Sequence, residues 1–427
     1  MFKRMSALLL TAAFLCGCTA AGGSREEEST ATAAVPMIYR DMAVQATADL
    51  LSHFWNTHQN RITNNYTMVW EFGMMVFELE TMYDATGDEQ YKNYIATQWV
   101  AMQRVWNQDT ISVPGRSPND ANDDAAWNAM TLMAVWRMTG DTKALQWVYQ
   151  VIRRAYDYWG DYDRTPSPAG LYYDYRDSAG QNRVDPNAPG AVPGDKSFYA
   201  AGLLLSALEY TQASGDNSLL QESLNLHAWM ETNLRRDGVK TFGDRTLTAN
   251  DDLYYIGFNE SNPAKPYGPL GGNVLGITEA GSDSGLFGNM AMAAINVLVS
   301  QITGDDTWRQ HAVETANAIP VSLYNNHGVL LNDRDAWVEA AFVRYWVTDV
   351  LTLPGVDPEN LSLIADTAQS IMTVARTSDG YYYAEWSGGN GWERKGQTNH
   401  TQLMTNANTV HMVAAAALAE SMGLIQG

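Results

Sequence analysis

A short turn recurs along this chain and limits the folds it can adopt. An apolar segment ends in Thr or Ser followed by Gly and Asp, and a second helical segment starts at once. Gly suits the left-handed position that ends a helix, and Asp suits the cap of the next one. The irregular spacing of these turns argues against a fixed-repeat solenoid. The strict turns are Thr86-Gly87-Asp88, Thr139-Gly140-Asp141, Ser214-Gly215-Asp216 and Thr303-Gly304-Asp305, with Pro354-Gly355 and Asp357 as a looser fifth.

Apolar periodicity on both sides of the turns predicts twelve helices. The even-numbered helices are the more apolar, as in Met68–Met82, and the odd-numbered ones carry more charge, as in Asp88–Arg104. Six apolar helices inside six amphipathic ones describe an all-α (α/α)6 toroid. The expected helices are 40–58, 68–86, 88–107, 122–139, 141–160, 197–214, 216–234, 284–303, 305–321, 336–351, 357–376 and 402–422.

This arrangement gives the toroid two different faces. One face holds the short Gly-Asp turns, and the other holds every long connection into an inner helix. Loops on a rigid scaffold commonly carry function, so we expect the functional site on the second face. The long connections are 59–67, 108–121, 161–196, 235–283, 322–335 and 377–401.

Asp123 and Asp124 open the fourth helix, which is an inner one. On local sequence alone, an aspartate here could simply cap the helix. Two carboxylates in one place can also divide into a nucleophile and a proton donor, because like charges drive their pKa values apart. Their place on the long-connection face favours the catalytic interpretation.

Three other patterns offer competing sites. Asn250-Asp251-Asp252 repeats the acidic pair, but the Leu253-Tyr254-Tyr255-Ile256 that follows it predicts a strand or hairpin. Gly268–Gly276 is glycine-rich but has neither the strand nor the Lys-Ser/Thr of a phosphate loop. The seven histidines show no metal-binding spacing, so we expect no metal site.

The N-terminus predicts an export signal. Lys3 and Arg4 precede an apolar run that is too short to span a membrane, and Leu15-Cys16-Gly17-Cys18 resembles a bacterial lipobox. A plain signal peptide is the alternative. We expect a signal at 1–17, lipidation of Cys18, a flexible tether at 18–38 with an acidic Glu26-Glu27-Glu28, and a catalytic domain at 39–427. This pattern predicts a lipid anchor in the bacterial outer membrane. The acidic residues close behind Cys18 favour exposure on the cell surface, with the periplasmic face as the alternative.

The overall charge narrows the choice of partners. The formal net charge is −21, and it becomes −23 when Lys3 and Arg4 leave with the signal. A polyanion such as nucleic acid is therefore an unsuitable partner. We also expect a monomer whose only membrane contact is the lipid anchor. The 14 Trp and 22 Tyr could stack on sugar rings or fill the core.

Several of these aromatic residues lie in segments that resemble glycoside hydrolase family 76, the endo-α-1,6-mannanases and their relatives. The resemblance covers nearly the whole chain after the tether and includes the twelve-helix layout. Two positions differ from the family pattern, namely Ser282-Asp283-Ser284-Gly285 and Asp195-Lys196-Ser197-Phe198, and they leave the sugar and linkage open. The matching segments are Asp123, Asp124 and Trp127 in an Asp-Asp-x-x-Trp motif, Gly170–Asp174 and Phe342-Val343-Arg344-Tyr345.

The resemblance implies retaining hydrolysis of internal α-1,6-mannosidic bonds in α-mannan, without a cofactor. By that resemblance Asp123 matches the nucleophile and Asp124 the general acid/base. Two other functions remain open, a non-catalytic surface glycan-binding lipoprotein and another (α/α)6 enzyme that acts on acidic sugars. The candidate substrate-binding residues are Asn122, Trp127, Tyr173, Asp174, Asp283, Arg344 and Trp386.

Overall fold

A computed structural model describes residues 38–63, 69–105, 121–179, 184–194, 196–242, 245–258, 286–322, 328–330, 338–387 and 402–426. The chain divides into Met1–Pro36 and Met37–Gly427, and all of these residues belong to the second unit. The predicted signal, Cys18, Gly268–Gly276 and Asp283 lie outside the described residues.

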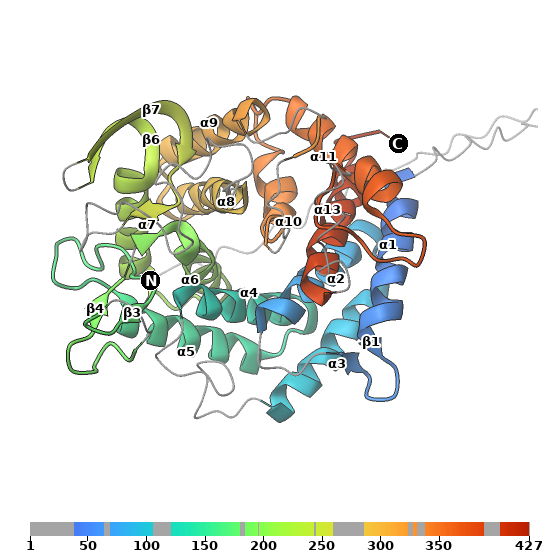
Figure 1. Ribbon diagram of the computed structural model, residues 1–427, viewed down its shortest axis with the longest axis horizontal. Helices are drawn as coiled ribbons and strands as arrows, with labels where there is room; N and C mark the ends of the chain where they lie inside the picture. The colour runs from blue at the N-terminus through green and yellow to red at the C-terminus, as the bar shows by residue number, and fades with distance from the viewer. Residues whose placement is uncertain are drawn as a thin grey trace, which may run out of the picture. The chain divides into compact units, whose positions relative to one another are not determined.

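Within the described ranges, six helical segments form an inner ring and six surround them (Figure 1). Around the inner ring α2 packs on α4, α4 on α6, α6 on α8, α8 on the α10 segment, and that segment on α13, which returns to α2. The inner helices are α2 (Val69–Thr86), α4 (Asn122–Thr139), α6 (Ala201–Ser214), α8 (Leu286–Thr303), α10 (Val343–Tyr345) and α13 (Leu403–Ser421). The outer helices are α1 (Ile38–Phe54), α3 (Glu89–Val105), α5 (Thr142–Trp159), α7 (Leu220–Leu234), α9 (Asp306–Ser322) and α11 (Glu359–Ser370). The predicted (α/α)6 toroid is confirmed.

The recurring turns have the predicted geometry. In each strict turn the Gly has a positive φ, between 67° at Gly87 and 75° at Gly304, and its N–H donates to a carbonyl four residues back. The Asp carboxylate then accepts the backbone N–H two residues further on, as Asp141 does from Lys143 at 2.9 Å. The preceding hydroxyl accepts the Asp N–H, as Thr139 does from Asp141 at 3.2 Å. Each turn therefore ends one helix and caps the next with its own side chains.

Some helix boundaries differ from the prediction. α1 ends at Phe54 instead of residue 58, because β1 (Trp55–Asn56) turns back through Asn60, at φ 50°, to pair with β2 (Arg61–Ile62). α6 is preceded by the 3-10 turn Phe198–Ala200. The tenth and eleventh helices both end in π-helical turns, Trp346–Val350 and Ile371–Ala375.

The remaining described strands lie in the long connections and pair antiparallel. The pairs are β3 (Tyr175–Arg176) with β4 (Val192–Pro193), β5 (Lys196–Ser197) with β8 (Gly257–Phe258), and β6 (Arg235–Phe242) with β7 (Arg245–Tyr254). Because β7 contains Asp251 and Asp252, the predicted hairpin around that acidic pair is confirmed.

The inner helices supply the core. Every residue of α8 from Leu286 to Ser300 is buried. This helix is long and apolar enough to cross a membrane by composition, but 83% of it is buried inside the unit. Its apolar surface is therefore covered by the other helices, as expected for an inner helix of a toroid.

A buried ion network joins the inner helices at the short-turn end. Arg137 in the last turn of α4 contacts Glu80 of α2 at 2.5 Å and Glu209 of α6 at 2.9 Å. Arg344 of α10 contacts Asp84 of α2 at 2.7 Å. Burial would raise the pKa of Glu80, but Arg137 and Arg344 hold it at about 2. Removing one partner of such a network would leave an uncompensated buried charge.

Glu78 is a second buried carboxyl group, between α2 and α1. It is 0% exposed, and Thr47 Oγ1 donates to its Oε1 at 2.5 Å. Its Oε2 has no hydrogen-bond partner among the residues the structure describes. Burial raises the pKa of Glu78 from 4.5 to about 8, so the folded protein keeps this group protonated near neutral pH.

Glu78→Gln should therefore change how stability depends on pH. The folded pKa exceeds the unfolded one, so the wild type loses stability as pH rises from 4.5 towards 8. The slope is about 1.4 kcal/mol per pH unit from this group, and the neutral Gln removes it. Urea unfolding should give the wild type and Glu78→Gln similar free energies of unfolding at about pH 4. At about pH 8 Glu78→Gln should be the more stable of the two.

Glu89→Gln on α3 is the matched control, because this side chain is 64% exposed. It should follow the wild type at every pH. A Glu78→Gln effect that is the same at acidic and alkaline pH would contradict the assignment of a buried, protonated carboxyl group.

Candidate functional site

Asp123 and Asp124 occupy the first turn of α4, and neither is its cap. The cap is Ala121, with φ −92° and ψ 157°, and it makes no side-chain hydrogen bond to the helix. Asp123 Oδ1 accepts the backbone N–H of Asp124 at 3.0 Å, and both aspartate side chains are half-buried. Neither aspartate is therefore the N-cap residue, although Asp123 accepts one N–H group of the first turn. The unpaired N–H groups of the helix end favour negative charge here.

The connection before α6 runs directly across the start of α4. The backbone N–H of Asn122 donates to the Tyr173 carbonyl at 2.8 Å, and Asn122 Nδ2 donates to the Tyr172 carbonyl at 3.1 Å. The Tyr173 hydroxyl donates to Asp123 Oδ2 at 3.4 Å. The structure thus brings Asn122, Asp123, Asp124 and Tyr173 together, although they come from two distant stretches of sequence.

Two of the predicted substrate-binding residues hold this connection from within. Asn122 is 0% exposed and Asp174 is 1% exposed. The Asp174 carbonyl accepts the N–H of Gly194 at 2.9 Å, and a Cβ at Gly194 would meet the Asp174 carboxylate at 2.3 Å. In these positions they support the backbone around the aspartate pair, and they are not exposed to a ligand.

Aromatic rings from several inner helices meet beneath the pair. Trp127 lies 6.5 Å from Phe287 and 6.2 Å from Phe342, measured between ring centroids. Tyr199 lies 5.4 Å from Phe287 and 5.5 Å from Tyr173. Trp127 is 4% exposed, so it is mainly part of this cluster. The sequence did not single out Tyr199 or Phe287, although both lie at the start of an inner helix, as Asp123 does.

A fully buried lysine fixes the connection from the other side. Lys196 Nζ contacts Asp161 Oδ2 at 2.6 Å and donates to the Ala169 carbonyl at 2.7 Å. Burial would raise the pKa of Asp161, but the Lys196 ammonium outweighs this effect and lowers it. Asp161 is therefore ionised, and the pair bridges the two ends of the connection.

Trp386 and Arg344 do not lie where the sequence predicted. Trp386 is 0% exposed, and its Nε1 donates to Thr409 Oγ1 of α13 at 3.1 Å, so it is a core residue. Arg344 belongs to the ion network that contains Arg137. Arg137 lies 14 residues after Asp123, which is about 21 Å along α4. Neither residue is part of the candidate site as predicted, and Asp283 lies outside the described residues.

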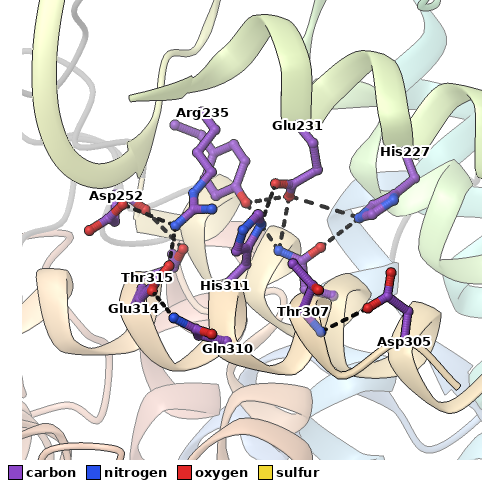
Figure 2. Close-up of polar contacts among 12 residues, drawn as sticks. His227, Glu231, Arg235, Asp252, Asp305, Thr307, Gln310, His311, Glu314 and Thr315 are labelled. Atoms are coloured by element: carbon purple, nitrogen blue, oxygen red, sulfur yellow. Dashed lines mark hydrogen bonds and ion pairs between the residues drawn. The ribbon is translucent and has the colours of Figure 1, made fainter. Parts of the chain in front are cut away.

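The competing acidic pair is occupied by ion pairs. Arg235 contacts Asp252 at 3.0 Å and also Glu314 of α9, and Arg236 contacts Asp251. Figure 2 shows the first of these groups beside α9. The two aspartate carboxylates therefore pair across the strands of the β6–β7 hairpin, and Glu314 ties Arg235 of the hairpin to α9.

Figure 2 also shows a buried cluster around Glu231 of α7. Its carboxylate accepts hydrogen bonds from Tyr254 and Asn296 and contacts His311 Nδ1 at 2.9 Å. Burial opposes ionisation, but these partners hold the pKa of Glu231 at about 2. The cluster joins α7, α8, α9 and β7 and is satisfied internally. Among the described residues, no group of three or more His, Cys, Asp or Glu could hold a metal ion.

No protein-family model matches the sequence, and no curated protein matches it. Solved structures do match. The first is an inactive variant of the α-1,6-mannanase of Salegentibacter sp. HEL1_6, with two consecutive aspartates changed to asparagine, in complex with α-1,6-mannotriose. It is 14% identical, with a TM-score of 0.64, and the match covers 89% of this chain and 99% of that one.

Two further structures place this likeness in context. A family 76 mannosidase from Bacteroides thetaiotaomicron VPI-5482 is 14% identical with a TM-score of 0.65, covering 90% of this chain and 100% of that one. An unsaturated glucuronyl hydrolase from Bacillus sp. GL1 is 16% identical with a TM-score of 0.55, covering 90% and 96%. The unit therefore has the (α/α)6 fold seen in the solved glycoside hydrolases of family 76.

Proposed function

We propose that this protein is a family 76 glycoside hydrolase that cleaves internal α-1,6-mannosidic bonds with retention of configuration. The observation that carries the proposal is the position of Asp123 and Asp124. They lie side by side in the first turn of an inner helix, half-buried, and neither is the N-cap residue. In the Salegentibacter mannanase, a variant altered at two consecutive aspartates is described as inactive and binds α-1,6-mannotriose.

The geometry of a helix suits a division of labour between the two carboxyl groups. Consecutive helical residues point about 100° apart, so two side chains can approach one sugar bond from different sides. Asp123 would attack the anomeric carbon while Asp124 gives its proton to the departing glycosidic oxygen. A covalent glycosyl-enzyme forms and the leaving sugar is released. Asp124, now ionised, removes a proton from water, which attacks the same carbon and restores Asp123.

The second candidate is hydrolysis of an unsaturated uronide, because the glucuronyl hydrolase shares the fold. Its TM-score is lower than those of the family 76 structures. The net charge of −21 also disfavours an anionic sugar. The third candidate is a glycan-binding protein without catalysis. Such a protein would not need one aspartate ionised and the other protonated.

Asp123→Asn and Asp124→Asn should each lower the rate of cleavage of unbranched α-1,6-mannan by several orders of magnitude. Melting and circular dichroism should change little, because the replacements are isosteric and the side chains are half-buried. Asp251→Asn and Asp252→Asn are the controls and should keep most of the activity, because those carboxylates hold the hairpin. An essential hairpin pair with a dispensable α4 pair would place the site elsewhere.

The two roles can be separated with a fluoride leaving group, which hardly needs a proton. Asp124→Ala should convert α-1,6-mannobiosyl α-fluoride to a glycosyl-enzyme, and azide should release it as the α-azide. Asp123→Ala lacks that first step, so azide would displace fluoride directly and give the β-azide. Proton NMR of the products distinguishes the anomers. The opposite pairing of variant and anomer would exchange the two roles, and no rescue in either would favour a binding protein.

We further propose that Cys18 carries the lipid that anchors the protein to the outer membrane, where it would meet polymeric mannan. The support is the lipobox-like Leu15-Cys16-Gly17-Cys18 and the polar segment behind it. Cys18→Ala should abolish labelling by a fatty-acid analogue in expressing cells and release the protein from membranes. A membrane-associated wild type that takes up no label would contradict the anchor.

A further inference from the structure

We propose that Tyr173 is a positioning residue for Asp123, and that the buried Lys196–Asp161 pair holds Tyr173 in place. This inference rests on the proposed function, because it assigns a role in the work of Asp123. The segment concerned, Leu171–Tyr173, is here named the strap.

The strap is fixed at its base by Lys196. The Lys196 side chain is 0% exposed and reaches both Asp161 and the Ala169 carbonyl. Its ammonium lies 4.7 Å from the ring centroid of Tyr172 and 5.6 Å from that of Trp229. Charge, hydrogen bonds and cation–π contacts thus act together at one buried point.

The backbone at this point is closely packed. Gly170 has φ 89°, and a Cβ there would come within 2.8 Å of the Trp229 ring and 2.9 Å of Lys196. The Tyr172 N–H donates to the Trp159 carbonyl at 2.8 Å, and Tyr172 forms an isolated antiparallel β-bridge with Lys196. The strap therefore has little room to shift without moving Lys196.

The other side of the strap is attached to the start of α4. The carbonyls of Tyr172 and Tyr173 both accept from Asn122, whose side chain is completely buried. The same strap thus fixes the residue directly before Asp123 by two hydrogen bonds. A displacement of the strap would be passed to the first turn of α4.

The Tyr173 hydroxyl completes the connection. It donates to Asp123 Oδ2 at 3.4 Å, while Oδ1 accepts the N–H of Asp124 at 3.0 Å. Its ring rests on Tyr199, with centroids 5.5 Å apart. Holding both oxygens fixes the plane of the carboxylate, and a nucleophile misplaced by 1 Å can cost about 100-fold in rate.

Tyr173→Phe separates positioning from packing, because it keeps the ring and removes the hydroxyl. With α-1,6-mannotetraose, kcat should fall about 10- to 100-fold with KM within about twofold. The acidic limb of the kcat/KM profile should move to higher pH, because the ionised Asp123 loses a donor. Tyr156→Phe, which loses a buried hydroxyl contact between Tyr156 of α5 and Ser223 of α7, is the control and should keep both parameters and the profile.

Lys196→Met tests the base of the strap against Arg344→Met, which removes a cation that is only 16% exposed and that belongs to the ion network at the other end of the ring. Both should lower the melting temperature. Only Lys196→Met should lower kcat and speed hydrogen exchange at the Asn122 amide, which donates to Tyr173. If Lys196→Met does not fold, Asp161→Asn replaces it and should show the same changes to a smaller degree, because Asn still accepts a hydrogen bond from Lys196.

Unchanged kcat and pH profile in Tyr173→Phe would overturn the proposal. The proposal would also be overturned if Lys196→Met and Arg344→Met, at equal loss of stability, changed kcat and hydrogen exchange at the Asn122 amide equally. If the wild type cleaves no α-1,6-mannoside, the proposed function has failed. In that case hydrogen exchange at the Asn122 amide still tests whether Lys196 holds the strap against α4. Equal exchange rates in the two cation variants would overturn that link.

Discussion

The described inner helices α2, α4, α6, α8 and α13 begin at the same end of the ring, and the rest of the structure depends on this constraint. It arises because each short turn sends the chain back through an outer helix before the next inner one. The N-termini of these inner helices, with their unpaired N–H groups, are therefore gathered at one end, and their C-termini at the other. Carboxylates are favoured at the first end, where Asp123 and Asp124 lie. Arg137, in the last turn of the same helix, lies at the second.

The two ends hold the inner ring together by different means. At the C-terminal end, Arg137 and Arg344 connect α2, α4, α6 and α10 through the buried Glu80 and the partly buried Glu209 and Asp84. At the N-terminal end, aromatic rings meet beneath the aspartate pair, and the strap crosses the start of α4. Because both ends are fixed, the pair is carried by a rigid scaffold, as a catalytic constellation requires.

The turns, and the place of Asp123 and Asp124 in the first turn of α4, were predictable because their causes are local. Gly at positive φ and a capping Asp act within a few residues, so four turns were enough to indicate the toroid. Arg344 and Trp386 were misplaced because their partners, Asp84 and Thr409, are distant in sequence. Arg344 and Trp386 stand out in the sequence as polar or aromatic residues beside an inner helix. Their side-chain partners in the core could not be identified from the sequence. Lys196 was noticed only as a departure from the family pattern, since its partner Asp161 lies 35 residues away.

The central claim is that Asp123 and Asp124 form a retaining pair at the N-terminus of α4. Proton NMR of wild-type hydrolysis of α-1,6-mannotetraose tests it most directly, because the first-formed reducing end reports the stereochemistry before mutarotation. We expect the α anomer to appear first and then to equilibrate with the β anomer. Initial formation of the β anomer would contradict the covalent mechanism, and intact tetraose after prolonged incubation would contradict the activity itself.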